Sequence, residues 1–450
     1  MSREPVRVPW LERRIISSIR RLEGRRDSDS NSGERVFWLP PDRLDDRQIR
    51  VLTLLVGASL LSAFVNTLFT QTVAFAGDDL GVGDWGRGVA GTVVRMGIII
   101  GLPAAILADR IGRRRVVVTL AWVAPILASL GALAPNFPLL VATQTLSRPL
   151  GLALDLLVAV IAAEEMPRSS RAYAVSVLAM ANGLGAGVAV IALPLADIGP
   201  GGWRLVYALS LIWLLVAIKI TRWLPETERF TRLERTPSRR TVAKNQTPDR
   251  RRRLAIQIAV GFFGNMLLSP ASFFQNSYLK DDRGFSAGMV SLFTIVTSAP
   301  AVLGLVIGGR IADRRGRRRV AVLCTPIGGF LIALSFATNS TLMWSSAIVG
   351  AIFAASAYPS LAVYRTELFA TSRRGLSGFV ILASALVGGS FSLLITGALA
   401  DSGVSYGPIM LALVFGPIAV SLIVLFTYPE TAHTELEELN PEDSDIDRHG

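Results

Sequence analysis

Three charged residues lie deep inside apolar stretches of this sequence: Arg95, Arg148 and Asp155. A charge within hydrocarbon is costly, and such residues usually serve a function. Arg148 and Asp155 are seven residues apart, which places them two turns apart on the same face of an α-helix. Two guanidinium groups against one carboxylate leave a surplus of positive charge, which suits a carboxylate or another anionic ligand. Asp155 is the acid that we expect to carry a proton, since we find no other acid well inside these stretches.

A structural interpretation of the same residues stays open. Arg148 and Asp155 can form a static buried pair that holds neighbouring helices together, and Arg95 can bond backbone carbonyls or extend toward the lipid surface. Amide and aromatic side chains in the same stretches are candidate binding contacts, although amides in membrane helices often only bridge neighbours. The predicted contacts are Asn66, Gln71, Asn265, Gln275 and Asn276, with an aromatic wall from Phe273, Phe274, Tyr358 and Tyr364.

The composition of the chain is that of a membrane protein. Of its 450 residues 51% are hydrophobic and 18% are charged, and the mean hydropathy is +0.47. A soluble domain is usually nearer a quarter charged. Because a helix needs roughly 20 apolar residues to cross a bilayer, we expect an all-α membrane protein with twelve transmembrane helices. The expected spans are 51–75, 88–108, 115–134, 138–162, 172–195, 204–224, 254–278, 286–309, 320–337, 341–364, 376–400 and 407–428.

Polar segments divide the chain into five parts. Six-helix bundles are expected over 51–224 and 254–428, a basic cytosolic linker over 225–253 and an acidic tail over 429–450. The basic tail over 1–50 lacks the short apolar core of a secretory signal peptide. Within it, 8–22 has the spacing of an amphipathic helix on an anionic membrane surface, and a disordered tail is the alternative.

The basic residues set the expected orientation. Segments on the side of the two termini hold 38 Lys and Arg, whereas the opposite loops hold only Arg87, Arg204, Lys280 and Arg283. By the positive-inside rule, we expect both termini in the cytosol and the protein in the plasma membrane. The net charge is +12, but its clustering between apolar runs argues against a nucleic-acid-binding protein.

Four motifs occur twice at nearly the same spacing. At an offset of 204 residues, Asp109–Arg115 matches Asp313–Arg319, and Pro225–Thr227 matches Pro429–Thr431. At an offset of 203 residues, Glu164 and Arg171 match Glu367 and Arg374, and Asp78–Asp79 matches Asp281–Asp282. Each half holds six spans, so the two copies are expected to have the same polarity and to rock around a central site. At the 203 offset, the mates of the three buried charges are the uncharged Ser298, Ala351 and Tyr358.

The repeated loop resembles the signature G-x-L-A-D-R-x-G-R-R of the major facilitator superfamily, with Ala105 in place of the glycine in the first copy. The resemblance extends from about 51 to 439, and Arg148–Gly151 looks like the R-x-x-G pattern of the fourth helix. It implies a cavity lined by helices 1, 4, 7 and 10, and charge clusters that latch a cytosolic gate; topology anchoring alone is the alternative. The expected gate residues are Asp109, Arg113, Glu164, Arg171, Asp313, Arg317, Glu367, Arg374, Glu226 and Glu430.

Further motifs are similar to the sugar-porter and organic-ion branch of that superfamily, namely Pro225–Phe230, Tyr364–Arg374 and Pro429–Leu439. The branch's sugar-binding pattern is echoed only by Gln257, Gly261 and Asn265, so a hexose is not the expected substrate. We expect a secondary transporter for a small organic anion, coupled to protons as a symporter. A proton-driven efflux antiporter for drugs or metabolites is the alternative. No enzyme activity, cofactor, metal site or nucleic-acid partner is expected, and the protein is expected to be a monomer in the lipid bilayer.

Overall fold

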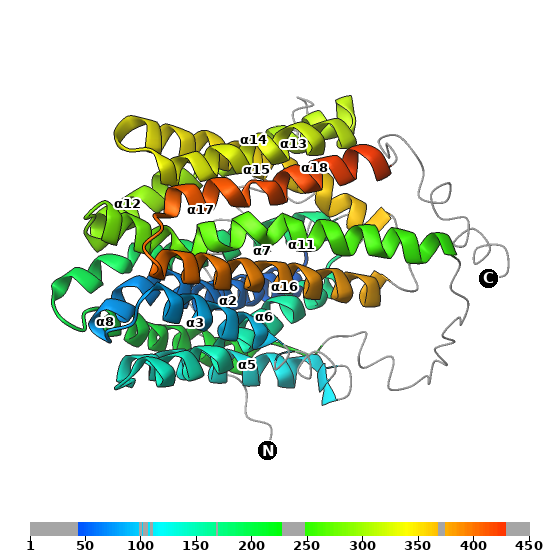
Figure 1. The fold of residues 1–450 in the computed structure, drawn as a ribbon. Helices are drawn as coiled ribbons and strands as arrows, with labels where there is room; N and C mark the ends of the chain where they lie inside the picture. Colours follow the sequence, from blue (N-terminus) through cyan, green and yellow to red (C-terminus); the bar gives the residue numbers. More distant parts are fainter. Residues whose placement is uncertain are drawn as a thin grey trace, which may run out of the picture.

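The computed structural model describes residues 44–98, 101, 107–108, 111–167, 170–226, 248–367 and 374–428. Within these ranges every regular element is helical, and the long helices lie side by side along one common direction (Figure 1). The predicted amphipathic helix at 8–22, most of the linker and the acidic tail lie outside the described residues. The expected all-α fold is therefore confirmed.

The first half contains six antiparallel passes of the chain. Its elements are α2 (Asp46–Asp79), α3 (Asp84–Met96), α5 (Arg113–Ser129), η1 (Leu130–Leu133), α6 (Phe137–Glu165), α7 (Arg171–Ile191), η3 (Leu193–Ile198), α8 (Trp203–Ala208), η4 (Leu209–Trp213) and α9 (Leu214–Trp223). The helix α3 begins the second predicted span, and much of the rest of that span lies outside the described residues.

The second half repeats this order. Its elements are α11 (Pro248–Ser277), η5 (Tyr278–Asp282), α12 (Ala287–Ser298), α13 (Ala301–Arg315), α14 (Arg317–Ala337), α15 (Ser340–Glu367), α16 (Arg374–Asp401), α17 (Tyr406–Leu413) and α18 (Phe415–Thr427). In Figure 1, α13, α14 and α15 form one side of the molecule and α5 lies at the other, with α2, α3, α6, α11 and α16 between them.

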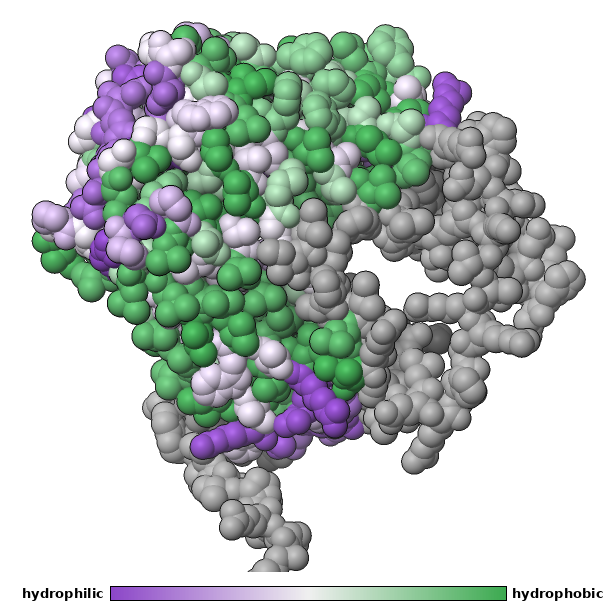
Figure 2. All heavy atoms as spheres, turned by 60° about the horizontal axis from the view of Figure 1, so that its bottom comes forward, coloured by the Kyte–Doolittle hydropathy of each residue, from purple (hydrophilic) through white to green (hydrophobic). Residues whose placement is uncertain are grey.

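Eleven of the described helical segments are long and apolar enough to cross a membrane. In Figure 2, hydrophobic residues cover most of the visible face, and hydrophilic residues gather toward its ends. Helices extend past the predicted spans because charged flanks continue the same helix: α11 begins at Pro248 rather than at 254. Proline fits the first turn, where its missing N–H costs no hydrogen bond.

The same close contact between two helices occurs once in each half of the structure. A Cβ on Gly101 would stand 2.6 Å from the carbonyl oxygen of Pro149, and a Cβ on Gly304 would stand 2.2 Å from that of Ile352. All four positions obey the 203-residue offset. Glycine at both places lets the second and fourth helices of each half approach backbone to backbone. The internal repeat therefore extends from sequence motifs to packing.

A second repeated contact joins the first and fifth helices of each half, and it provides a stability test. A Cβ on Gly185 would stand 2.2 Å from the carbonyl oxygen of Leu60, whereas one on Gly183 in the same helix would meet nothing within 4 Å. Gly185→Ala must push two backbones apart, so we expect a loss of about 1–3 kcal/mol in stability. The loss is measured as a fall in the melting temperature of the detergent-purified protein.

Gly183→Ala is the matched control for this prediction. Its methyl group has free space, and alanine favours the helix by up to about 1 kcal/mol over glycine. We therefore expect an unchanged or raised melting temperature. Equal melting temperatures for the two variants would show that the contact between Gly185 and Leu60 does not limit stability.

The two halves meet along several helix pairs at the end of the molecule that carries Arg87. At this end, called the Arg87 end below, Thr92 Oγ1 of α3 donates to the carbonyl oxygen of Ser390 in α16 over 3.3 Å. Ser291 Oγ of α12 likewise donates to the carbonyl oxygen of Val190 in α7 over 2.8 Å. The boundary between the two halves at this end is called the seam below. These hydrogen bonds lie on both sides of the seam and hold the two halves together here. The first residue of α2 and the last of α18 lie at the opposite end, called the termini end.

Candidate functional site

Arg95 reaches from the first half of the protein into the second. It lies in the last turn of α3, and a Cβ on Gly389 of α16 would stand 2.9 Å from its Nη1 and 2.5 Å from the Oγ of Ser269 in α11. The Nε of Arg95 and the Oγ of Ser269 are both buried without a hydrogen-bond partner among the described residues. The guanidinium group therefore lies where α3, α11 and α16 meet.

Arg148 lies close to Arg95 because α3 and α6 approach each other tightly. A Cβ on Gly97, which ends α3, would stand 2.8 Å from the carbonyl oxygen of Thr145, one turn before Arg148 in α6. The two positive charges are near enough to repel each other, and the Nε of Arg148 is also buried without a partner in the described part of the chain. Both side chains are partly exposed. Even partial burial of two like charges is costly unless an anion compensates them.

Asp155 lies away from this arginine pair, among the helices of the first half. Its Oδ1 accepts hydrogen bonds from the Nδ2 of Asn182 in α7 at 3.0 Å and from the Oγ of Ser59 in α2 at 3.3 Å. Within the described residues it forms no ion pair with Arg148. The static pair considered from the seven-residue spacing is thus not formed in this state, because neighbouring helices supply the partners of Asp155.

One of the predicted amide contacts lies beside the arginines. The Oδ1 of Asn66 in α2 is buried without a partner in the described part, and a Cβ on Gly151 of α6 would stand 2.9 Å from it. Its Nδ2 donates to the Oγ of Ser62 at 3.3 Å. In contrast, Asn265 donates to the carbonyl oxygen of Gly261 in its own helix. Asn66 therefore packs against α6 at Gly151, one turn from Arg148.

Other predicted contacts belong to the closed seam at the Arg87 end. The Nδ2 of Asn276 in α11 donates to the Oε1 of Gln71 in α2 at 3.0 Å and to its backbone oxygen at 2.8 Å, across the two halves. Phe274 is fully buried and packs edge-on against Phe273 and at a tilt against Tyr406. These side chains fill the seam and do not line an open wall in this state.

The remaining predicted contacts are spread over the second half. Gln275 donates from Nε2 to the Oγ1 of Thr294 in α12 at 3.0 Å. Tyr358 of α15 is 59% exposed, whereas Tyr364 is fully buried and packs edge-on against Tyr428. The predicted aromatic wall is therefore not assembled as one surface.

The termini end carries charge clusters at several of the positions expected for a gate. Arg113 forms an ion pair with Glu164 of α6, both largely buried. Glu226 accepts a hydrogen bond from the backbone N–H of Arg114 at 3.1 Å. Arg47 pairs with Glu165 at 3.4 Å. These contacts each join segments of the first half.

The rest of the expected gate is described only in part. Arg317 begins α14 and has partners in the structure. Arg171, Asp313, Glu367 and Arg374 lie within helices whose described part does not include their side chains. Asp109 and Glu430 lie outside the described residues.

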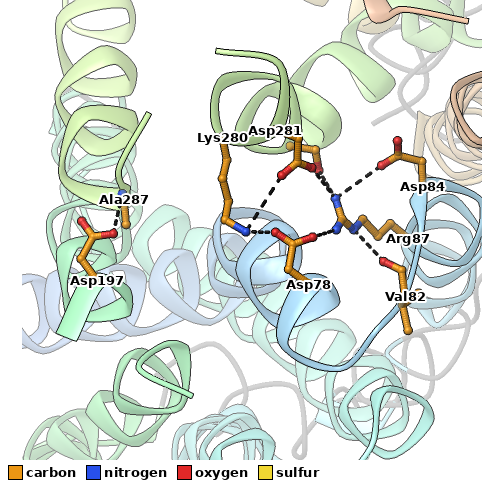
Figure 3. A network of polar contacts seen from close by, with 9 residues as sticks. Asp78, Val82, Asp84, Arg87, Asp197, Lys280, Asp281 and Ala287 are labelled. Atoms are coloured by element: carbon orange, nitrogen blue, oxygen red, sulfur yellow. Dashed lines mark hydrogen bonds and ion pairs between the residues drawn. The ribbon is translucent and has the colours of Figure 1, made fainter. Parts of the chain in front are cut away.

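A buried arginine, Arg87, forms the main ionic contact between the two halves at its own end (Figure 3). Its side chain is 4% exposed. Nη1 donates to the Oδ2 of Asp281 at 2.9 Å and to the Oγ of Ser277 at 3.3 Å, both in the second half. Within the first half, Nη2 pairs with Asp78 and Nη1 lies 3.4 Å from Asp84. One guanidinium group thus gathers three carboxylates from both halves.

Two further contacts join the halves at the Arg87 end. Lys280 of the second half pairs with Asp78 and lies over the ring of Phe75. Asp197, at the end of the fifth pass, accepts from the backbone N–H groups of Ala287 and Gly288 at 2.8 and 2.9 Å, and so caps α12 (Figure 3). A carboxylate at a helix N-terminus satisfies free N–H groups and the positive end of the helix dipole. The Arg87 end therefore carries a network of charged contacts that joins the two halves.

A partial signal for this network is present in the sequence. Arg87 and Lys280 were two of only four basic residues in the loops opposite the termini, and the repeated acidic pairs at 78–79 and 281–282 face them. Sequence reasoning assigned these residues to topology and repeat alone. It could not show that Arg87 is buried between the halves, since that depends on how the bundles dock.

Comparisons with known proteins agree with this architecture. The model of the Major Facilitator Superfamily matches twice, over residues 55–276 and 254–444. The inward-open xylose transporter XylE from E. coli superposes with a TM-score of 0.70 at 16% identity, covering 88% of this chain and 99% of that one.

Two further solved structures are similar. The nucleoside transporter NupG gives a TM-score of 0.67 at 12% identity, covering 84% of this chain and 100% of that one. An inward-facing bacterial homologue of the human lysosomal transporter Spinster gives 0.63 at 17% identity, covering 85% and 95%. No curated protein matches the sequence. With a family model matched over nearly the whole chain and two bundles of the same order, the chain belongs to the Major Facilitator Superfamily.

Proposed function

We propose that this transporter moves a small organic anion in symport with a proton. Alternating access in a membrane-spanning carrier is the working mode of its family, and the arginine pair supports the finer assignment. Arg95 and Arg148 are partly exposed side chains whose Nε atoms are buried. They lie close to each other and have no acidic partners among the described residues. A carboxylate that accepts hydrogen bonds from guanidinium groups supplies the missing charge in a favourable geometry.

The position of Arg95 ties anion binding to the movement of the halves. Its Nη1 lies against Gly389 and beside Ser269, both in the second half, while Arg148 belongs to α6 of the first. An anion bound to both guanidinium groups therefore lies at the boundary between the bundles. Rocking of the bundles changes the contacts at this boundary, so the anion can be exposed to one side and then the other.

Asp155 is the proposed proton site. It is a partly buried acid whose hydrogen-bond partners, Asn182 and Ser59, are neutral. A carboxyl group in such surroundings can be protonated without breaking an ion pair. Its partners come from α7 and α2, so a change in its protonation alters contacts between helices of the first half.

The proposed orientation places both termini in the cytosol of a cell, with the protein in the plasma membrane. The excess of Lys and Arg on the termini side supports it. The Arg87 end then faces outward, and the state described here is closed to the outside. The similar structures of XylE and the Spinster homologue are inward-open and inward-facing conformations, which fits this assignment. The charge clusters at Glu164 and Glu226 become part of a cytosolic gate.

The test begins with a thermal-shift screen of small carboxylates, neutral solutes and amines on the purified protein, since a ligand that binds only the folded state raises the melting temperature. A carboxylate found in this way is then loaded into proteoliposomes with an imposed pH gradient. We expect wild-type accumulation of up to about tenfold per pH unit, the equivalent of 1.36 kcal/mol. Asp155→Asn is expected to abolish this accumulation while keeping exchange of labelled against unlabelled substrate.

Asp46→Asn serves as the control, because Asp46 is an exposed acid in the first turn of α2. It should accumulate substrate as the wild type does. Normal pH-driven accumulation by Asp155→Asn would remove Asp155 from coupling. A screen in which amines or neutral solutes bind and no carboxylate does would reject the anion.

A further inference from the structure

The second half contains a cavity of about 160 Å³ between α11, α12, α14 and α15. This volume is close to that of the roughly 150 Å³ cavity known to hold benzene in another protein, so the cavity has room for one six-membered ring. Three of its lining residues, Leu268, Ser272 and Ser298, are exposed, whereas Phe293 and Phe336 are buried. The cavity is therefore accessible where the exposed residues line it and closed where the two aromatic rings line it.

The internal repeat shows where this space comes from. At the 203-residue offset, Ala347 and Ala351 of the cavity wall correspond to Gln144 and Arg148 of the first half. Gln144 is fully buried, and its Nε2 donates to the carbonyl oxygen of Ala128. Two alanines in place of two long side chains leave room in the second half that these side chains occupy in the first.

The hydroxyl groups of the wall are available as acceptors and not as donors. Ser272, Thr297 and Ser335 line the cavity, and each donates its hydroxyl proton to a backbone carbonyl oxygen of its own helix, over 3.0, 2.8 and 2.7 Å. A hydroxyl group has one proton and two lone pairs. Since the protons are already used, these oxygens can bond a ligand only by accepting a proton from it.

The rest of the wall suits a ring with few polar groups. Among the described residues that line the cavity none is acidic or basic, so a charged ligand would lose its hydration without gaining an ionic partner. Leu268, Phe293, Ile332 and Phe336 present hydrocarbon, against which most hydroxyl groups of a sugar ring would be unpaired. Apolar and aromatic walls with a few fixed polar groups are typical of sites for small molecules.

We propose that this cavity is a second ligand site, separate from the arginine pair, for an uncharged six-membered ring that carries one hydrogen-bond donor, such as a phenol or a cyclic alcohol. The ring packs against Phe293, and its hydroxyl group donates to the oxygen of Ser272 or Thr297. Every residue of the wall belongs to the second half. Occupation of the cavity therefore requires neither Arg95 nor Arg148, and the site is additional to the proposed anion transport.

The test measures the melting temperature of the purified protein with three probes: cyclohexanol, cyclohexanone and D-xylose. Ala347→Leu places a larger side chain in the cavity, so the part of a probe's effect that is lost in this variant reports binding in the cavity and not partition into detergent. We expect such a part for cyclohexanol, at least about threefold weaker binding of cyclohexanone, which cannot donate, and none for D-xylose. Ala351→Val is a milder filling of the same space, and it decides the test if Ala347→Leu does not purify as a folded protein.

Val349→Leu is the matched control, because Val349 is an exposed residue of the same helix that does not line the cavity. It should respond to all three probes as the wild type does, and so should Arg148→Gln if the site is separate from the arginine pair. The same response to cyclohexanol in the wild type and in the cavity variants would overturn the site. Equal affinity for cyclohexanone and cyclohexanol would overturn the ligand class, and loss of cyclohexanol binding in Arg148→Gln would overturn the separation of the two sites.

Discussion

Replacing Arg148 with glutamine is expected to weaken substrate binding at least thirtyfold without destabilising the empty protein. Losing one partner of a buried, hydrogen-bonded charge pair costs about 2–5 kcal/mol, and each 1.4 kcal/mol is a factor of ten in affinity. The pair in question forms only when the carboxylate is bound. In the empty state the guanidinium group has no acidic partner in the described part of the chain, so its removal relieves an uncompensated, partly buried charge.

This combination separates a binding role from a structural one. If Arg148 held the first bundle together, Arg148→Gln would lower the melting temperature of the empty protein. If it binds substrate, the empty protein keeps or gains stability, and only the ligand-induced rise in melting temperature is lost. The measurement is a pair of melting curves, with and without the carboxylate found in the screen.

Arg148→Lys refines the same experiment. Lysine keeps the positive charge but lacks the planar fork that binds a carboxylate through two parallel hydrogen bonds. We expect it to recover part of the affinity lost in Arg148→Gln. Arg222→Gln, at the termini end of α9, is the control and should bind normally. A lowered melting temperature of empty Arg148→Gln, together with unchanged ligand shifts, would contradict the assignment.

The transmembrane spans could be predicted because they depend on local sequence. A run of about 20 apolar residues can cross the membrane only as a helix, and the duplicated motifs show that two such bundles have equal polarity. The depth of Arg95 and Arg148 followed from their positions within spans. Their lack of acidic partners could not be predicted in this way. Asp155 lies on the same face of α6 as Arg148, which suggests an ion pair, but its hydrogen-bond partners, Asn182 and Ser59, come from other helices.

Contacts between the halves were beyond sequence reasoning for a related physical reason. Gln71 and Asn276 were predicted as separate substrate contacts, yet they bond to each other across the closed seam. Phe274 was predicted to face a cavity, and in this state it is packed against Tyr406. Which face of a helix is covered depends on the conformational state of the transporter, and the sequence encodes at least two such states.

Replacing Arg87 with glutamine is expected to open the Arg87 end of the protein. The guanidinium group holds Asp78, Asp84 and Asp281 around one buried point. Without it, carboxylates from the two halves face each other with only Lys280 between them. Asp78 and Asp281 are more than a third exposed, so water screens the carboxylates that remain. Hydrogen bonds to charged groups contribute about 1.5–3 kcal/mol, and losing this much shifts a two-state equilibrium by about a factor of ten or more.

The shift can be measured with one reporter cysteine. The natural chain has a single cysteine, Cys324, so Cys324→Ser supplies a background free of thiols. Thr92→Cys then places a thiol in the closed seam, where Thr92 contacts the backbone of Ser390. We expect a membrane-impermeant maleimide to label it slowly in the otherwise unchanged protein and at least tenfold faster in Arg87→Gln when added from the Arg87 side.

Two further variants show whether charge, rather than general damage, opens the seam. Arg204→Gln removes an arginine at the same end that bonds only carbonyl oxygens of its own half, those of Ala132 and Ala134, among the contacts described. It should leave labelling slow. Adding Asp281→Asn to Arg87→Gln removes one of the facing carboxylates and should slow the labelling again, because less repulsion remains between the halves. Slow labelling in Arg87→Gln itself would mean that apolar packing around Phe69 and Phe273, not the ionic network, keeps this end closed.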